Sequence, residues 1–364
     1  MVAAAPIVLV MRFLRTALAC AAFFFALHST SSAAAPGPLG ELQTQLSSLS
    51  MHAPGNVGIV IKDLTTGLTS GVNASADMPA ASIIKIPVMV EVFRQMALGT
   101  IGLNDTLHLQ RGDRDNGWGD LADARTGSGY SVSKLMWLMI TESDNTATNM
   151  LIRRIGRDHI NTTMRKLGLA QTRLGDYIRS DGDIRSLRSS PNDMMKLLEA
   201  MAQDRLVDEW SSRAMITILT GQHHNGLLPQ PLPRGIQIAH KTGTLHDTLN
   251  DVGIVYMNSE PYIIAVMTTH LPSLDSGRRF IRNVSSAAFR QLARFATWRE
   301  TNEIPTLAKV PVVTSPDASM WQTPTGVLTP IDSSATATNT EERLPPPAAP
   351  APAEPADPSA TPAP

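Results

Sequence analysis

The extended segments of this chain stand at the two ends of its central region, and a long helical stretch separates them. Residues 57–64 are rich in β-branched side chains, and a Thr-Thr-Gly turn leads into a second extended run that ends at Val72. This pattern predicts a β-hairpin. Three more predicted strands follow much later, at 236–240, 252–258 and 262–269. One antiparallel sheet can hold the hairpin and these strands only if the intervening helices fold beside it. We therefore expect an α/β fold, with an antiparallel sheet flanked by helices, a helical subdomain, and a cleft between the two parts.

Segments with helical periodicity lie between these strands and after the last of them. The segment 81–96 is apolar throughout, which predicts a largely buried helix, and Pro87 near its start is tolerated in a first turn. Another helix, 194–202, is opened by a serine cap, Ser190, which precedes a proline and stands three residues before Asp193. The remaining predicted helices are 131–140, 145–155, 157–167, 208–219 and 276–299.

Residues 1–35 have the order of a secretory signal peptide. They contain no acid, carry Arg12 and Arg15 ahead of an apolar run from Ala17 to Leu27, and continue with small residues to Ala35. The apolar run is shorter than the roughly 20 residues that a spanning helix needs. We expect cleavage near Ala33 or Ala35, no stable membrane span afterwards, and a periplasmic or secreted protein. A retained N-terminal anchor is the alternative.

Cysteine and histidine usage narrows the possible chemistry. The single cysteine, Cys20, lies within the apolar run, so the mature chain would contain none. Disulfides, thiol catalysis and zinc–thiolate sites are then excluded together. His223 and His224 are adjacent and cannot point to one ion from a regular element, and the chain has no His-Glu-x-x-His motif. We expect no metal and no other cofactor.

Composition divides the rest of the chain into one domain and a tail. From about Pro311 the sequence is rich in Pro, Ala, Ser and Thr, which predicts a disordered tail over 311–364. One domain remains, over 37–305. The chain has 31 basic and 32 acidic residues, a balance that gives no basic stripe for nucleic acid. We expect a monomer whose partners are small molecules.

The first of three short motifs with candidate chemistry contains Ser82 and Lys85. The two residues stand three apart at the start of the predicted buried helix, so the hydroxyl and the amine share one face. An amine among apolar residues favours its neutral form and can accept a serine proton. An N-cap serine beside a surface lysine is the simpler interpretation, but Ile83, Ile84 and Ile86 make a surface position unexpected.

The other two motifs are polar. Ser-Asp-Asn at 143–145 lies at the junction of two predicted helices, where these residue types also serve as ordinary caps. Lys-Thr-Gly-Thr at 241–244 ends the predicted strand 236–240, and its glycine would let a ligand approach the backbone closely. An ordinary charged strand edge with a bulge is the alternative for this last motif.

Taken together and in this order, the three motifs resemble the signature of class A β-lactamases and penicillin-binding proteins. Ser143 follows Ser82 by 61 residues and precedes Lys241 by 98, which suits that fold. The resemblance covers about residues 40–300. It implies a β-lactamase or DD-peptidase-like catalytic domain over 37–305, a serine hydrolase that opens β-lactams through an acyl-enzyme, and a role in antibiotic resistance.

The resemblance also implies which residues carry the reaction. Ser82 would form the acyl-enzyme, Lys85 would activate it, and Ser143 would relay the proton to the departing lactam nitrogen. Lys241 would help to keep Lys85 neutral through the repulsion of like charges.

Substrate binding is implied for the remaining motif residues. Asn145 would bind the acylamide side chain of the substrate, while Lys241 and Thr242 would hold its carboxylate. The backbone N–H groups of Ser82 and Thr244 would form the oxyanion hole.

The sequence departs from class A enzymes in the loop that serves deacylation. These enzymes carry a Glu-x-x-Leu-Asn segment whose glutamate activates the deacylating water. The corresponding stretch here, 172–184, contains Asp176, Asp181 and Asp183 but no glutamate. We therefore expect acylation with slow deacylation. The alternative is a penicillin-interacting, acyl-trapping or peptidase-like cell-wall protein that acts on peptidoglycan-like peptides.

Overall fold

The computed structural model describes residues 37–180, 186–257 and 260–307. The predicted signal peptide and the predicted tail lie outside these residues. The α-helices of the described part are α2 (Pro38–Met51), α3 (Lys85–Ala97), α4 (Val132–Thr141), α5 (Asn145–Ile155), α6 (Arg157–Lys166), α7 (Pro191–Ala202), α8 (Glu209–Thr220) and α9 (Leu274–Thr301). None of these helices is both long and apolar enough to cross a bilayer.

One five-stranded antiparallel sheet joins the two ends of the domain. Its strands run in the order β2-β1-β10-β9-β8. Strand β1 pairs with β10 along its whole length, from Asn56 opposite Thr269 to Asp63 opposite Tyr262. The predicted fold class is therefore confirmed. The strands are β1 (Asn56–Asp63), β2 (Thr69–Val72), β8 (Gln237–Leu245), β9 (Thr248–Met257) and β10 (Glu260–Thr269).

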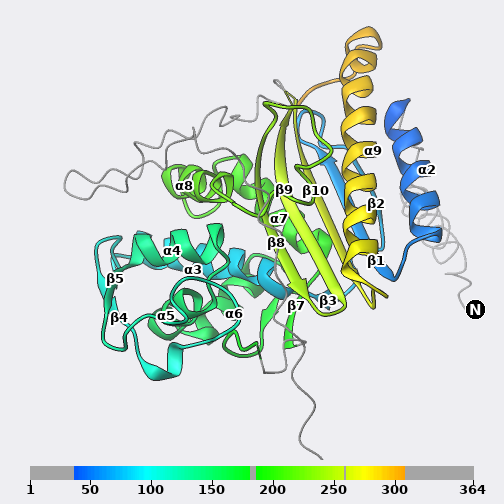
Figure 1. Cartoon of the computed structure of the whole chain (residues 1–364). Helices are drawn as coiled ribbons and strands as arrows, with labels where there is room; N and C mark the ends of the chain where they lie inside the picture. Colours follow the sequence, from blue (N-terminus) through cyan, green and yellow to red (C-terminus); the bar gives the residue numbers. More distant parts are fainter. Residues whose placement is uncertain (1–36, 181–185, 258–259, 308–364) are drawn as a thin grey trace, which may run out of the picture.

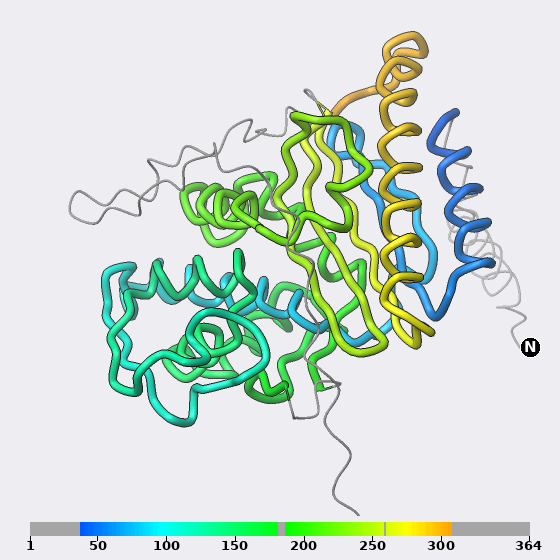
Figure 2. Tube along the Cα trace, in the orientation of Figure 1, coloured from blue at the N-terminus to red at the C-terminus, as the bar shows by residue number. Residues whose placement is uncertain are grey.

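The two faces of the sheet bury two separate cores. Side chains alternate along a strand, so Ile59 joins a core with Leu42 of α2 and Phe295 of α9, whereas Val60 joins the opposite core with Phe93 of α3. Figures 1 and 2 show α2 and α9 side by side over one face and the helical block beyond the other. Strand β8 stands at the sheet edge, beside that helical block.

The fold differs from the sequence prediction at three places. Helix α2 was not expected, although Leu39, Leu42 and Leu46 recur with a helical period and are buried. The predicted helix 81–96 begins as a 3₁₀ turn, η1 (Ala81–Ile84), and becomes α-helical at Lys85. Strand β8 runs on to Leu245, so the Lys-Thr-Gly-Thr motif lies inside the strand rather than after it.

Short elements fill the connections of the helical part. Strands β3, β7 and β6 form one small sheet, and β4 and β5 form another. Their bounds are β3 (Met78–Pro79), β7 (Leu187–Ser189), β6 (Arg173–Leu174), β4 (Thr106–His108) and β5 (Gly129–Ser131), with a second 3₁₀ turn, η2, at Arg111–Asp113.

Candidate active site

Ser82 lies in η1, a turn whose entrance is anchored to the sheet and has a strained backbone. The buried amide of Asn250 on β9 donates to the carbonyls of Pro79 at 2.9 Å and Ala80 at 3.1 Å, so the sheet fixes the entrance to this turn. Ala81 has φ +48°, a strained value for a residue with a side chain. In a 3₁₀ turn, residues three apart lie above one another, which aligns Ser82 with Lys85.

Lys85 is fully buried, and its amine is directed at the Ser-Asp-Asn motif. The Nζ atom lies 3.1 Å from Ser143 Oγ, donates to Asn145 Oδ1 at 2.7 Å, and donates to the Ser143 carbonyl. Burial, and after it the positive charge of Lys241, lowers the pKa of Lys85 well below the usual range of a lysine, against the opposing pull of Asp144 and other carboxylates. Among the described residues no hydrogen bond joins Lys85 Nζ to Ser82 Oγ.

Ser143 occupies the point where the helical block meets the sheet. Its φ is +57°, in the left-handed region. Its Oγ accepts a hydrogen bond from Lys241 Nζ at 3.0 Å, so the two buried amines meet at one hydroxyl. Asp144 caps α5 through a 2.7 Å bond from the Ala147 N–H, and burial raises the pKa of its carboxyl group. This residue therefore has a structural role, which its type at a helix start already indicated.

The edge strand β8 brings the third motif against η1. A Cβ atom on Gly243 would lie 2.9 Å from the Ala80 carbonyl oxygen and 3.1 Å from the Ile83 nitrogen, so only glycine fits here without a shift. Lys241 is fully buried, and its Nζ also donates to the Thr242 carbonyl at 3.1 Å. The sequence predicted that a ligand approaches the backbone at this glycine, whereas the neighbour in the structure is the protein's own segment at η1.

The predicted site residues converge, although the sequence places them on separate elements. A narrow cavity of about 10 Å³, room for a single water, is lined by Ser82, Trp118, Ser143, Thr242 and Thr244. Lys85, Asn145 and Lys241 are bonded to each other or to Ser143 directly beside this cavity. Trp118 was not among the predicted site residues; its ring also contacts His224 edge-on, with centroids 6.2 Å apart.

A buried carboxylate, Asp115, supports the site and was missed from the sequence. Its Oδ1 accepts from Asn145 Nδ2 at 2.8 Å and from Ser180 Oγ at 2.5 Å, and its Oδ2 accepts from the Ser180 N–H at 2.7 Å. Burial raises the pKa of Asp115, but these hydrogen bonds outweigh it and hold the pKa below its usual value. Asp115 thereby orients Asn145, which in turn holds Lys85. A lone aspartate in a loop gave no signal for this.

The described part of the segment 172–184, which is 172–180, is anchored by an asparagine. The side chain of Asn149 donates to the Ile178 carbonyl at 2.9 Å and accepts from the Ile178 N–H at 2.8 Å, and Ile178 is buried. Asp176 is exposed and accepts a hydrogen bond from the Tyr177 N–H. Asp181 and Asp183 lie outside the described residues. No carboxylate lines the narrow cavity within the described part of the chain.

Within the described ranges, no three or more His, Cys, Asp or Glu side chains are grouped so that they could hold a metal ion. The cavity and its surroundings present the hydroxyls of four residues, the amines of Lys85 and Lys241 and the amide of Asn145; the four hydroxyls belong to Ser82, Ser143, Thr242 and Thr244.

The arrangement matches a known family. Residues 41–292 match the profile of the β-lactamase enzyme family. The chain belongs to this family. The match includes all three motifs, so the convergence of Ser82, Lys85, Ser143 and Lys241 is that of a serine β-lactamase family member, whose fold forms acyl-enzymes.

Solved structures of the β-lactamase family agree in fold. PBP-A is 30% identical, with a TM-score of 0.66 over 70% of this chain and 96% of its own. A point mutant of PBP-A, in an acyl-enzyme complex with penicillin G, is 29% identical, with a TM-score of 0.66 over 71% of this chain and 100% of its own. A β-lactamase from Sphaerobacter thermophilus DSM 20745 is 28% identical, with a TM-score of 0.65 over 70% of this chain and 97% of its own.

Proposed function

We propose that this family member is an exported serine hydrolase that opens β-lactams through an acyl-Ser82 intermediate and releases the product slowly. The observation that carries the proposal is the fully buried amine of Lys85, with its lowered pKa, in the same site as Ser82 and Ser143. Burial and the charge of Lys241 favour the neutral form of this amine, and only the neutral form can accept a proton.

The hydrogen bonds of Lys85 connect its amine to the Ser-Asp-Asn motif. Nζ donates to the Ser143 carbonyl, to Ser143 Oγ and to Asn145 Oδ1. A neutral amine has two N–H donors and one lone pair, so in the proposed reaction one of these three donors is replaced by the lone pair that accepts the Ser82 proton. Lys241 Nζ donates to the same Oγ, so Ser143 stays hydrogen-bonded.

The acylation step follows from this arrangement. Ser82 Oγ attacks the lactam carbonyl carbon, its proton passes to the Lys85 amine, and the carbonyl oxygen gains negative charge near the backbone N–H groups of Ser82 and Thr244. The C–N bond then breaks, and Ser143 delivers the proton to the nitrogen while the proton on Lys85 replaces it. In this proposal Lys241 and Thr242 hold the substrate carboxylate, and Asn145 binds its acylamide group.

Slow deacylation is supported by the surroundings of Ser82. A water must be deprotonated to attack the ester, and no carboxylate among the described residues lines the cavity. Asp115, the carboxylate that orients Asn145, already accepts hydrogen bonds from Asn145, Ser180 and the Gly117 N–H. The alternative is a penicillin-interacting protein that stays acylated or acts on peptidoglycan-like peptides. The similarity to PBP-A supports this alternative.

We expect a chromogenic cephalosporin to give a burst equal to the enzyme concentration, followed by a slow steady phase. The reason is that a missing positioned base slows its step by about 10²–10⁴. The measurement is stopped-flow absorbance, with intact-mass spectrometry of the benzylpenicillin adduct over time. Fast linear turnover without a trapped adduct would refute slow deacylation. In that case Asp176→Asn, Asp181→Asn and Asp183→Asn, made singly, would show which carboxylate accelerates it.

Export is a separate expectation from the same proposal. The chain expressed in a Gram-negative host should be recovered from the periplasm with an N-terminus between residues 34 and 37, because small residues follow the apolar run. N-terminal sequencing of the periplasmic protein checks this. A chain begun at Met11 should be processed at the same bond, since it keeps both arginines. Periplasmic protein that retained Arg12 would show that no cleavage occurs.

A further inference from the structure

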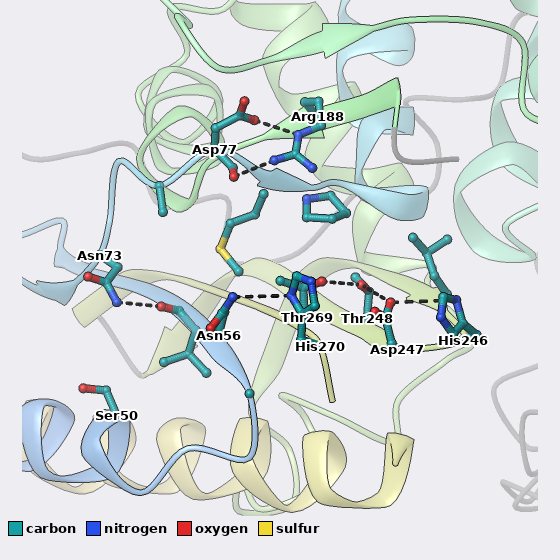
Figure 3. A pocket seen from close by; sticks show the side chains of 16 residues that line it. Ser50, Asn56, Asn73, Asp77, Arg188, His246, Asp247, Thr248, Thr269 and His270 are labelled. Carbon is teal, nitrogen blue, oxygen red and sulfur yellow. Dashed lines mark hydrogen bonds and ion pairs between the residues drawn. The ribbon is translucent and has the colours of Figure 1, made fainter. Parts of the chain in front are cut away.

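A cavity of about 580 Å³ lies at the end of the sheet where β8 turns into β9 (Figure 3). It shares no lining residue with the narrow cavity beside Ser82. Its carboxylates already have partners, because Asp77 is paired with Arg188 at 2.9 Å and Asp247 accepts a hydrogen bond from Thr248 at 3.0 Å. This cavity is therefore separate from the acylation site and offers it no charged group.

The polar segment 222–225, which follows α8, contacts the end of α4 just before Ser143. The buried side chain of Gln222 donates from Nε2 to the Ile140 carbonyl at 3.0 Å. The N–H of the next residue donates to the Thr141 carbonyl at 3.4 Å. The last turn of α4 is thereby bonded to this segment twice, through side chain and backbone.

The same segment is fixed to the sheet through a buried histidine of β8. His240, the residue before Lys241, has its Nε2 3.0 Å from Asn225 Oδ1 and its Nδ1 2.9 Å from Asp251 Oδ1. The segment thus joins α4 to β8, and these two elements lead into the residues that meet at the site. There Lys241 Nζ donates to Ser143 Oγ at 3.0 Å.

An ion pair adds to the contact between the segment and α4. His223 Nδ1 lies 2.5 Å from Glu142 Oε1, and the two side chains are 44% and 28% exposed. The hydrogen bond between them raises the pKa of His223 and lowers the pKa of Glu142, so both partners favour their charged forms. The other charged or titratable groups that act on the pair are Asp120 and His224.

The ion pair is attached directly to the strained backbone of Ser143. Glu142 is the preceding residue, and Ser143 has φ +57°, a value that persists in a residue with a side chain only where the surroundings hold it. On the far side, the Asp144 N–H donates to the Leu138 carbonyl at 3.1 Å. On the near side, the side chain of Glu142 is held by His223. The position of the Ser143 hydroxyl depends on this backbone.

We propose that His223 and Glu142 are positioning residues for acylation, whose ion pair keeps the Ser143 hydroxyl in place to protonate the departing nitrogen. The inference rests on the proposed function, in which Ser143 delivers this proton. Neither His223 nor Glu142 lines the narrow cavity, so both act through Ser143.

The test compares benzylpenicillin with a phenylacetylglycyl thioester of mercaptoacetate, which keeps the phenylacetyl group. A thiolate leaves without a proton, because thiols ionise at about pH 8.5, whereas the lactam nitrogen leaves as an amine and takes one. His223→Asn and Glu142→Gln should each slow acylation by benzylpenicillin about three- to fivefold, the effect of a partly exposed ion pair. Both variants should react with the thioester at the wild-type rate. Stopped-flow measurement of the first turnover gives both rates.

Two further variants make the result specific. The double variant should be no slower than either single one, since the same interaction is lost only once. His52→Asn, which removes an exposed imidazole at the end of α2, should leave both rates unchanged.

Unchanged acylation by benzylpenicillin in both single variants would overturn the inference. Equal slowing of benzylpenicillin and the thioester would also overturn it, since that result indicates a general disturbance of the site. In either case, acylation of the wild type by benzylpenicillin would uphold the proposed function. No acylation of the wild type would overturn both.

Discussion

Replacement of Ser82 by alanine should abolish covalent labelling by a fluorescent penicillin. The variant lacks the oxygen that forms the ester, and the hydroxyl is only partly buried and makes no hydrogen bond among the described residues, so the fold should survive. Gel fluorescence after denaturation measures the label, and circular dichroism checks the fold. We expect full loss of signal rather than a reduced rate.

A matched serine makes this result specific. Ser48→Ala removes an exposed hydroxyl on α2, remote from the three motifs in sequence and on an element that does not line the narrow cavity. It should label like the wild type. Labelling of folded Ser82→Ala at the wild-type level would mean that another residue is the nucleophile, and the assignment of the site would then be wrong.

Replacement of Lys85 by methionine should slow acylation by about 10²–10⁴, the contribution of a positioned general base. Methionine keeps a long unbranched side chain in the buried position but cannot take the proton of Ser82. The measurement is the second-order acylation constant of benzylpenicillin by intact-mass spectrometry. Lys134→Met, which removes an exposed amine on α4, is the control and should acylate normally.

The pH dependence of wild-type acylation tests the same residue without a mutation at it. Only the neutral amine is a base, so the acylation rate should rise with pH through the lowered pKa of Lys85 and then level off below the range of an ordinary lysine. Lys241→Met removes a like charge, raises the pKa of Lys85, and should move the rising limb to higher pH. A limb at the same pH in both proteins would contradict the coupling of the two amines.

Much of the fold was predictable because its elements have strong local patterns. The hairpin of β1 and β2, the caps at Ser190 and Asp208, and the glycine after α5 at Gly156 depend on neighbours in sequence. Helix α2 was missed although its leucines are periodic. Its stability depends on packing against α9 and β2, which are distant in sequence.

The candidate site was predictable only in its chemistry. Three motifs in the right order named Ser82, Lys85, Ser143 and Lys241, and the structure brings them together. Asp115 was missed, because an isolated aspartate in a loop has no pattern that distinguishes it. Trp118 was not assigned to the site, because a tryptophan packed on the helical block explains the sequence equally well. Their positions depend on a fold in which one loop meets Asn145 and the edge of β8 at once.

The sequence by itself determined which residues are available for the reaction, and that a lysine stands three residues after a serine in an apolar helix. Only the tertiary structure decided that the pKa of Lys85 is lowered. Its pKa falls because the amine is fully buried and a second buried amine, Lys241, comes from a strand more than 150 residues away. Desolvation and the repulsion of like charges act over a few ångströms of space, and the chain has to fold before Lys85 and Lys241 come within that range.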